Sequence, residues 1–124
     1  SKSFQKIIET VFNYWVSPNC QVPGIQSWQA YSEGVVSAFE SARASAESGS
    51  TSAIFTSGGT IATLVGHVLG LSADRVYEFY EPVFNCSITR LIFNVRKCSL
   101  STFNDVSHLQ LMSAQRGERL VTYR

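Results

Sequence analysis

The sequence has few charged residues and almost no net charge. Charged side chains make up 15% of its 124 residues, and ten basic residues nearly balance nine acidic ones, for a net charge of +1 at pH 7. The chain therefore lacks the broad electrostatic field that attracts nucleic acid or anionic lipid. We expect neither a nucleic-acid partner nor a membrane partner.

Long apolar runs, paired metal ligands and a secretory signal pattern are also missing. The three cysteines, Cys20, Cys86 and Cys98, show no Cys-x-x-Cys spacing, and His67 and His108 stand alone. We expect inert free thiols in a reducing, cytoplasmic compartment, with no metal site and no cofactor. The lone methionine lies at position 112, so we expect a processed product, an expressed piece or the ordered part of a longer protein.

Helical periodicity predicts two N-terminal helices separated by a loop. Apolar side chains recur with helical spacing over residues 4–15, and Pro18 helps to end this helix. Residues 17–24 are rich in turn-forming residues. A second apolar face covers residues 28–42, and Ser27 is suited to cap its first turn.

The central stretch predicts a strand, a glycine turn and a buried helix. Residues 53–56 are typical of a short buried strand, and residues 60–69 form a helix that is apolar over more than one face. Gly70 suits the C-terminal cap of this helix, and His67 within it is expected to be a core or interface histidine. A short helix is expected at residues 72–76.

The C-terminal half predicts a β-hairpin. Side chains alternate over residues 87–94, "NVRK" forms the turn, and residues 98–103 return. The last twenty residues are expected to be irregular, with a short strand at residues 119–124. The pattern indicates an α/β fold. One buried strand and a hairpin are too few for a sheet covered by three helices, so we expect part of the sheet to come from elsewhere.

The junction "FTSGGT" has the form of an anion-binding turn. The first N–H groups of a helix lack intrahelical partners and lie at the positive end of its dipole, where a phosphate is stabilised. Gly58 and Gly59 permit close approach, and Ser57 would face the same spot. The alternative is an ordinary turn that binds nothing. A serine nucleophile elbow is disfavoured because Phe55 replaces its first glycine, and a P-loop is disfavoured because no lysine follows the glycines.

Four stretches resemble the histidine phosphatase (phosphoglycerate mutase-like) superfamily, in order, over residues 25–110. "SWQAYSEGV" resembles the helix start after a Gly-Glu-Ser motif, and "AIFTSGGTIATLVGHVLGL" resembles the strand, His-Gly-Gly turn and helix. "NCSITRLIF" resembles the Asn-x-Ser strand, and "FNDVSHL" resembles the segment near the domain end. With its Ser-Gly-Gly turn and "LVTYR" end, the chain is most similar to a divergent bacterial branch.

The resemblance implies a phosphoglycerate mutase-like three-layer α/β fold, of which residues 1–124 form the C-terminal part of one domain. In the family, an Arg-His-Gly motif on a central strand supplies a histidine that becomes phosphorylated. Two arginines and a second histidine hold the phosphate, and a carboxylic acid protonates the leaving group. These 124 residues contain no Arg-His-Gly. We expect an incomplete fold, completed by a missing N-terminal half or by a second copy in a homodimer.

The resemblance also assigns site residues. Ser57 stands at the second-histidine position and binds phosphate with Gly58 and Gly59, although a serine brings no positive charge. Gln26 stands at the acid position but cannot release a proton, so it orients substrate or is an exposed loop residue without a role. Gly34 replaces an arginine usual in the following helix.

Three further residues are expected to be structural. Asn85 and Ser87 would fix the strand entry through backbone hydrogen bonds, and His108 would form a hydrogen bond near the sheet. Two functions remain open. One is part of a phosphatase that acts on a phosphorylated small molecule or phosphoprotein through a histidine outside this chain. The other is a catalytically inactive pseudophosphatase that serves as a binding or regulatory module.

Overall fold

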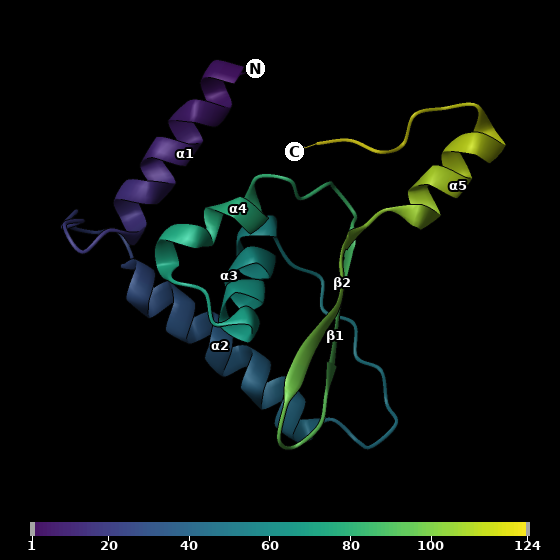
Figure 1. The fold of residues 1–124 in the computed structure, drawn as a ribbon, viewed down its shortest axis with the longest axis horizontal. Coiled ribbons are helices and arrows are strands. Elements are labelled where there is room, and N and C mark those ends of the chain that lie inside the picture. Colours follow the sequence, from purple (N-terminus) through teal and green to yellow (C-terminus); the bar gives the residue numbers. More distant parts are fainter. Residues whose placement is uncertain (1, 124) are drawn as a thin grey trace.

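The computed structural model describes residues 2–123 (Figure 1). In chain order, the elements are α1 (Lys2–Val16), α2 (Trp28–Ser45), α3 (Gly58–Leu69), the 3-10 helix η1 (Ala73–Arg75), α4 (Tyr77–Tyr80), β1 (Ile88–Phe93), β2 (Cys98–Asp105) and α5 (Ser107–Arg116). Over the described residues the protein is therefore α/β, with five α-helices and one two-stranded sheet. No helix in this range has the length and apolar character needed to cross a bilayer.

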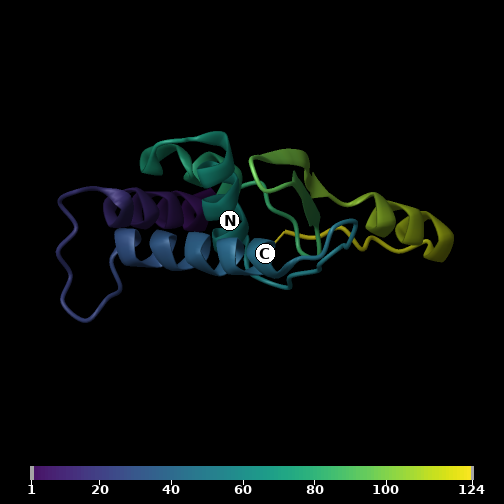
Figure 2. The same cartoon turned by 90° about the horizontal axis from the view of Figure 1, so that it is seen from below.

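Six aromatic rings join α1, α2 and α4, and we call them the aromatic cluster. Phe12 is central, because its ring centroid lies 5.6 Å from Trp28, 5.4 Å from Tyr77 and 5.7 Å from Tyr80. The remaining two rings are Trp15 and Tyr31, whose centroids lie 5.3 Å apart. The cluster fixes the crossing of α1 and α2, while the loop between them projects from one end of the molecule (Figure 2).

Helix α3 packs against both α2 and α4 and supplies much of the buried core. It begins at Gly58, two residues before the sequence suggested, and Gly70 ends it with the expected left-handed conformation, φ 68°. A Cβ on Gly66 would lie only 2.9 Å from Val76 Cγ2, so this glycine permits the close approach of Val76, which joins η1 to α4. His67 lies on the exposed face of α3 and not in the core, because the described elements cover only one side of the helix. Its alternative place at an interface stays a prediction.

The expected hairpin is present, with β1 and β2 antiparallel and Phe93 opposite Cys98. Asn94 closes the turn, since its side chain accepts hydrogen bonds from the backbone N–H groups of Arg96 and Lys97. Arg43 of α2 holds this turn. Its guanidinium donates to the Asn94 carbonyl and lies 5.8 Å from the centre of the Phe93 ring.

Residues 53–56 do not form the buried strand that their composition predicts. They have no regular secondary structure, and the side chains of Ile54 and Phe55 are 62% and 97% exposed. A strand needs a hydrogen-bonded neighbour, and the described chain places none beside this segment. We call residues 53–56 the extended segment.

The C-terminal region is more ordered than expected. Residues 107–116 form α5, which extends from the hairpin away from the other helices (Figure 1). Gly117 ends this helix at φ 68°. The strand expected at residues 119–124 is reduced to a single β-bridge, which joins Tyr123 to Phe84. Residue 124 lies outside the described range.

Removal of the central ring should destabilise the protein far more than removal of an exposed side chain from the same helix. We expect Phe12→Ala to lower the free energy of unfolding by about 2–3 kcal/mol, because three ring contacts from α2 and α4 are lost. Val11→Ala is the control, since Val11 is 60% exposed, and it should change stability by less than about 0.5 kcal/mol. Urea unfolding measures both. Equal effects would show that the aromatic cluster does not hold α1.

Candidate functional site

The N-terminus of α3 is not capped by its own N-cap side chain. Ser57 is the N-cap residue and has extended backbone, φ −89° and ψ 161°, yet its side chain makes no capping hydrogen bond. Ser27 has a similar backbone at the start of α2 and does accept from the Ala30 N–H, at 3.1 Å. Ser57 therefore leaves the first-turn N–H groups of α3 without a side-chain acceptor, at the positive end of the helix.

Hydroxyl groups surround this turn. Ser57 Oγ lies 3.3 Å from Thr60 Oγ1, which in turn lies 3.0 Å from Tyr31 Oη. A Cβ on Gly59 would lie 3.5 Å from Tyr31 Oη and 3.8 Å from Tyr80 Cε2, so the glycine keeps the space beside the two tyrosines open. We call Ser57, Gly58, Gly59 and Thr60 the α3 turn. It is polar, uncharged and bordered by the aromatic cluster.

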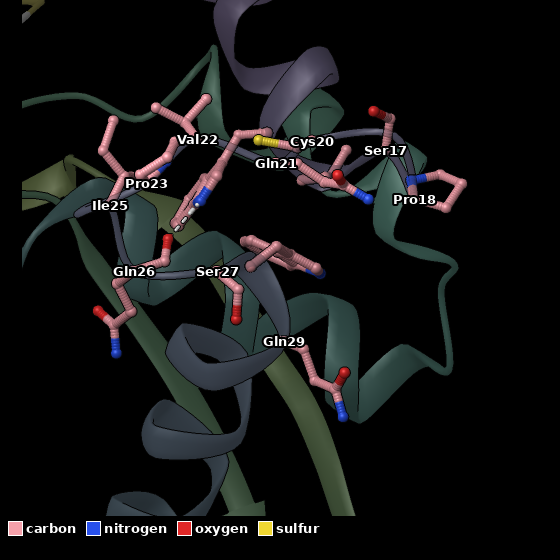
Figure 3. Close-up of a pocket in the computed structure, with 13 residues that line it drawn as sticks. Ser17, Pro18, Cys20, Gln21, Val22, Pro23, Ile25, Gln26, Ser27 and Gln29 are labelled. Atoms are coloured by element: carbon pink, nitrogen blue, oxygen red, sulfur yellow. Dashed lines mark hydrogen bonds between the residues drawn. The ribbon is translucent and has the colours of Figure 1, made fainter.

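Gln26 lies in a different place, in the loop before α2. Its backbone carbonyl accepts a hydrogen bond from Trp15 Nε1 at 2.8 Å, and its side chain points outward, away from Cys20 and Ser27 (Figure 3). The loop borders an open cavity of about 750 Å³, which is lined by residues between Trp15 and Gln29. None of the described residues that line it belongs to the α3 turn. The structure therefore does not bring Gln26 and Ser57 into one cavity.

A sequence model of the histidine phosphatase superfamily (branch 1) matches residues 3–106. This chain belongs to the histidine phosphatase superfamily. The matched range includes the α3 turn and Gln26, and membership supports a phosphatase-like function at the level of the superfamily. No curated protein and no solved structure matches the chain.

Asn85 of this histidine phosphatase chain binds the C-terminal segment. Its backbone N–H donates to the Thr122 carbonyl at 3.0 Å, and its amide Nδ2 donates to Thr122 Oγ1 and to the Tyr123 carbonyl. The Ser87 N–H donates to the Phe84 carbonyl at 3.3 Å, within the turn that leads into β1. Asn85 thus joins the start of the hairpin to the C-terminal segment, and Ser87 takes part in the turn before β1. Neither residue belongs to the α3 turn.

Asn104 organises the same region and is absent from the residues predicted from the sequence. Asn104 has a left-handed backbone, φ 57°, a conformation that asparagine tolerates better than most residues. Its Oδ1 accepts from the Phe84 N–H at 2.9 Å, and its Nδ2 donates to the Pro82 carbonyl at 2.7 Å. The signal available in the sequence was its place in "FNDVSHL". Tyr31 and Thr60 were missed as well, because their contact joins residues far apart in the chain.

Asp105 fixes the start of α5. Its carboxylate accepts hydrogen bonds from the Ser107 hydroxyl and, at 2.9 Å, from the Ser107 N–H. These bonds lower the pKa of Asp105, with smaller contributions from the charges of His108 and Arg90. His108, expected to be structural, is half-buried in the first turn of α5.

The cysteines and metal ligands are dispersed. Cys86 is exposed, with a left-handed backbone of φ 58°, and burial raises the pKa of the Cys98 thiol. Cys20 is half-buried. Across residues 2–123, no group of three or more His, Cys, Asp or Glu side chains is placed to hold a metal ion.

Acidification should release the first turn of α5. Because the folded pKa of Asp105 is lowered, its contribution to stability is complete above about pH 4, the ordinary pKa of aspartate, and is lost as the pH falls through the lower folded value. Asp105→Asn should remove this part of the acid response, and Glu118→Gln, which removes an exposed carboxylate, should leave it. An NMR titration of the Asp105 carboxyl carbon tests this directly. A pKa at or above the ordinary value would contradict the assignment.

Proposed function

We propose that these residues form the phosphate-binding part of a phosphatase that acts on phosphate esters, with its histidine nucleophile outside the 124 residues. The observation that carries the proposal is the uncapped α3 turn within a histidine phosphatase domain. Its first-turn N–H groups and the Ser57 hydroxyl are donors for phosphate oxygens. The substrate would be a phosphorylated small molecule or phosphoprotein.

The positions of the two histidines support a nucleophile from elsewhere. Neither belongs to an Arg-His-Gly motif. His67 lies near the C-terminal end of α3, whereas Ser57 precedes its first turn, and His108 lies on α5 beyond the hairpin. A 12-residue helix is about 18 Å long, so His67 is too far along it to attack a phosphorus atom held at the turn.

The exposed surface offers a place for the polypeptide that carries the nucleophile. The chain exposes 8,800 Å², about one third more than the roughly 6,600 Å² expected for a monomer of 13.7 kDa. An excess of about 2,000 Å² is what one partner contributes to a large permanent interface. The extended segment leads directly into the α3 turn and exposes Ile54 and Phe55. A strand that pairs with it would arrive beside the phosphate site.

The chemistry divides between the two parts. The α3 turn binds and orients the phosphoryl group but has no charged side chain of its own. Positive charge for the transition state must therefore come from the polypeptide that supplies the nucleophile.

Ser57 and Gln26 favour the second candidate, an inactive pseudophosphatase. Ser57 does not provide the positive charge of the family's second histidine, and Gln26 does not provide the proton of its carboxylic acid.

Trapping of the phosphorylated enzyme tests the proposal. The natural polypeptide that contains these residues is incubated with ³²P-labelled p-nitrophenyl phosphate, quenched in base and digested. We expect an acid-labile, base-stable phosphohistidine on a peptide outside residues 1–124, and unchanged labelling in His67→Gln and His108→Gln. Label on either of those histidines would overturn the proposal. An absence of both label and hydrolysis would instead establish the pseudophosphatase.

Restoration of positive charge at the α3 turn should accelerate the reaction. In the natural polypeptide, we expect Ser57→His to raise kcat/KM roughly tenfold, because a hydrogen bond from a charged donor is worth about 1.5–3 kcal/mol. Ser41→His, at an exposed serine of α2, is the control and should leave the rate unchanged. Steady-state hydrolysis of p-nitrophenyl phosphate measures both. An unchanged or lower rate for Ser57→His would place the phosphate elsewhere.

A further inference from the structure

Three hydroxyl groups form a continuous chain that ends at the α3 turn. Tyr31 Oη lies 3.0 Å from Thr60 Oγ1, and Thr60 Oγ1 lies 3.3 Å from Ser57 Oγ. The chain begins on α2 and ends at the residue before α3. Thr60 is the link, and the bond from Tyr31 to Thr60 spans 29 positions of the sequence.

The proton order in this chain follows from the capacity of each group. A hydroxyl has one proton to donate and two lone pairs that accept, so Thr60 can accept from Tyr31 while it donates to Ser57. A phenol is a stronger acid than an aliphatic alcohol, which favours donation from Tyr31 to Thr60 and from Thr60 to Ser57. The Ser57 proton is then directed outward. In this order, each bond strengthens the next.

The first hydroxyl is held by the aromatic cluster. The Tyr31 ring is half-buried, 5.3 Å from Trp15 and 6.0 Å from Trp28 between ring centroids. This packing holds the Tyr31 hydroxyl oxygen beside Thr60 Oγ1. Ser57 Oγ lies beside Thr60 Oγ1 and makes no capping hydrogen bond to α3, whereas Ser27 caps α2.

We propose that Tyr31 and Thr60 are positioning residues for phosphate binding. Through Thr60, Tyr31 holds Ser57 so that its proton faces the ligand and the first-turn N–H groups of α3 stay accessible. Neither the Tyr31 hydroxyl nor the Thr60 hydroxyl contacts the phosphate in this arrangement. The inference rests on the proposed function, in which the α3 turn binds phosphate.

Calorimetric titration of the natural polypeptide with inorganic phosphate tests this role. We expect Thr60→Val, which removes the hydroxyl at nearly constant shape, and Tyr31→Phe each to weaken binding roughly three- to tenfold. Thr60→Ser should bind within about twofold of the unmodified protein, because it retains the link in the chain. Tyr14→Phe removes the hydroxyl of a tyrosine that is 50% exposed on α1, and it should leave the affinity unchanged.

The double variant distinguishes a hydroxyl chain from a general structural effect. Once Thr60→Val has broken the chain, Tyr31→Phe should cause no further loss of affinity. Additive losses, or unchanged affinity in both single variants while Ser57→Ala weakens binding, would overturn the positioning role and leave the proposed function intact. If the unmodified polypeptide does not bind phosphate, both the proposed function and this inference fail.

Discussion

The ring contacts around Phe12 are the interaction on which the rest of the structure depends. The sheet has only two strands, and the described residues bury few apolar side chains completely. Helix α1 meets α2 and α4 mainly through the aromatic cluster, and α3 is held between α2 and α4. Aromatic rings bury large areas in few residues. A small set of contacts can therefore fix the helices even where the sheet provides little support.

The same cluster determines the surroundings of the α3 turn. Tyr31 and Tyr80 belong to it, and both lie beside Gly59. The positions of the Tyr31 hydroxyl and the Thr60 and Ser57 hydroxyls are thus consequences of helix packing. The opposite side of the turn is different, because the extended segment that leads into it is exposed and unpaired. The candidate site therefore has one side built by the aromatic cluster and one side that is exposed.

The parts of the fold that depend on local sequence were predictable, and those that depend on distant partners were not. The start of α2, the end of α3 and the hairpin were predicted correctly. Each is set by residues that act on their neighbours in the chain: Ser27, Gly70 and the "NVRK" turn. The extended segment has the composition of a buried strand, but pairing requires a neighbour. Helix α5 was missed because its start is set by hydrogen bonds to Asp105 rather than by an apolar face. For the site, sequence analysis located the turn but not its link to Tyr31.

In the proposed function, the first-turn N–H groups of α3 bind phosphate. The most direct measurement is a ¹⁵N–¹H NMR titration of the natural polypeptide with inorganic phosphate. We expect saturable shifts, with one dissociation constant, at the amides of Gly58, Gly59 and Thr60, and no shift at Gly117 beyond the end of α5. Two results would contradict phosphate binding at the α3 turn. In one, phosphate shifts amides elsewhere but not those of the α3 turn; in the other, it shifts no amide.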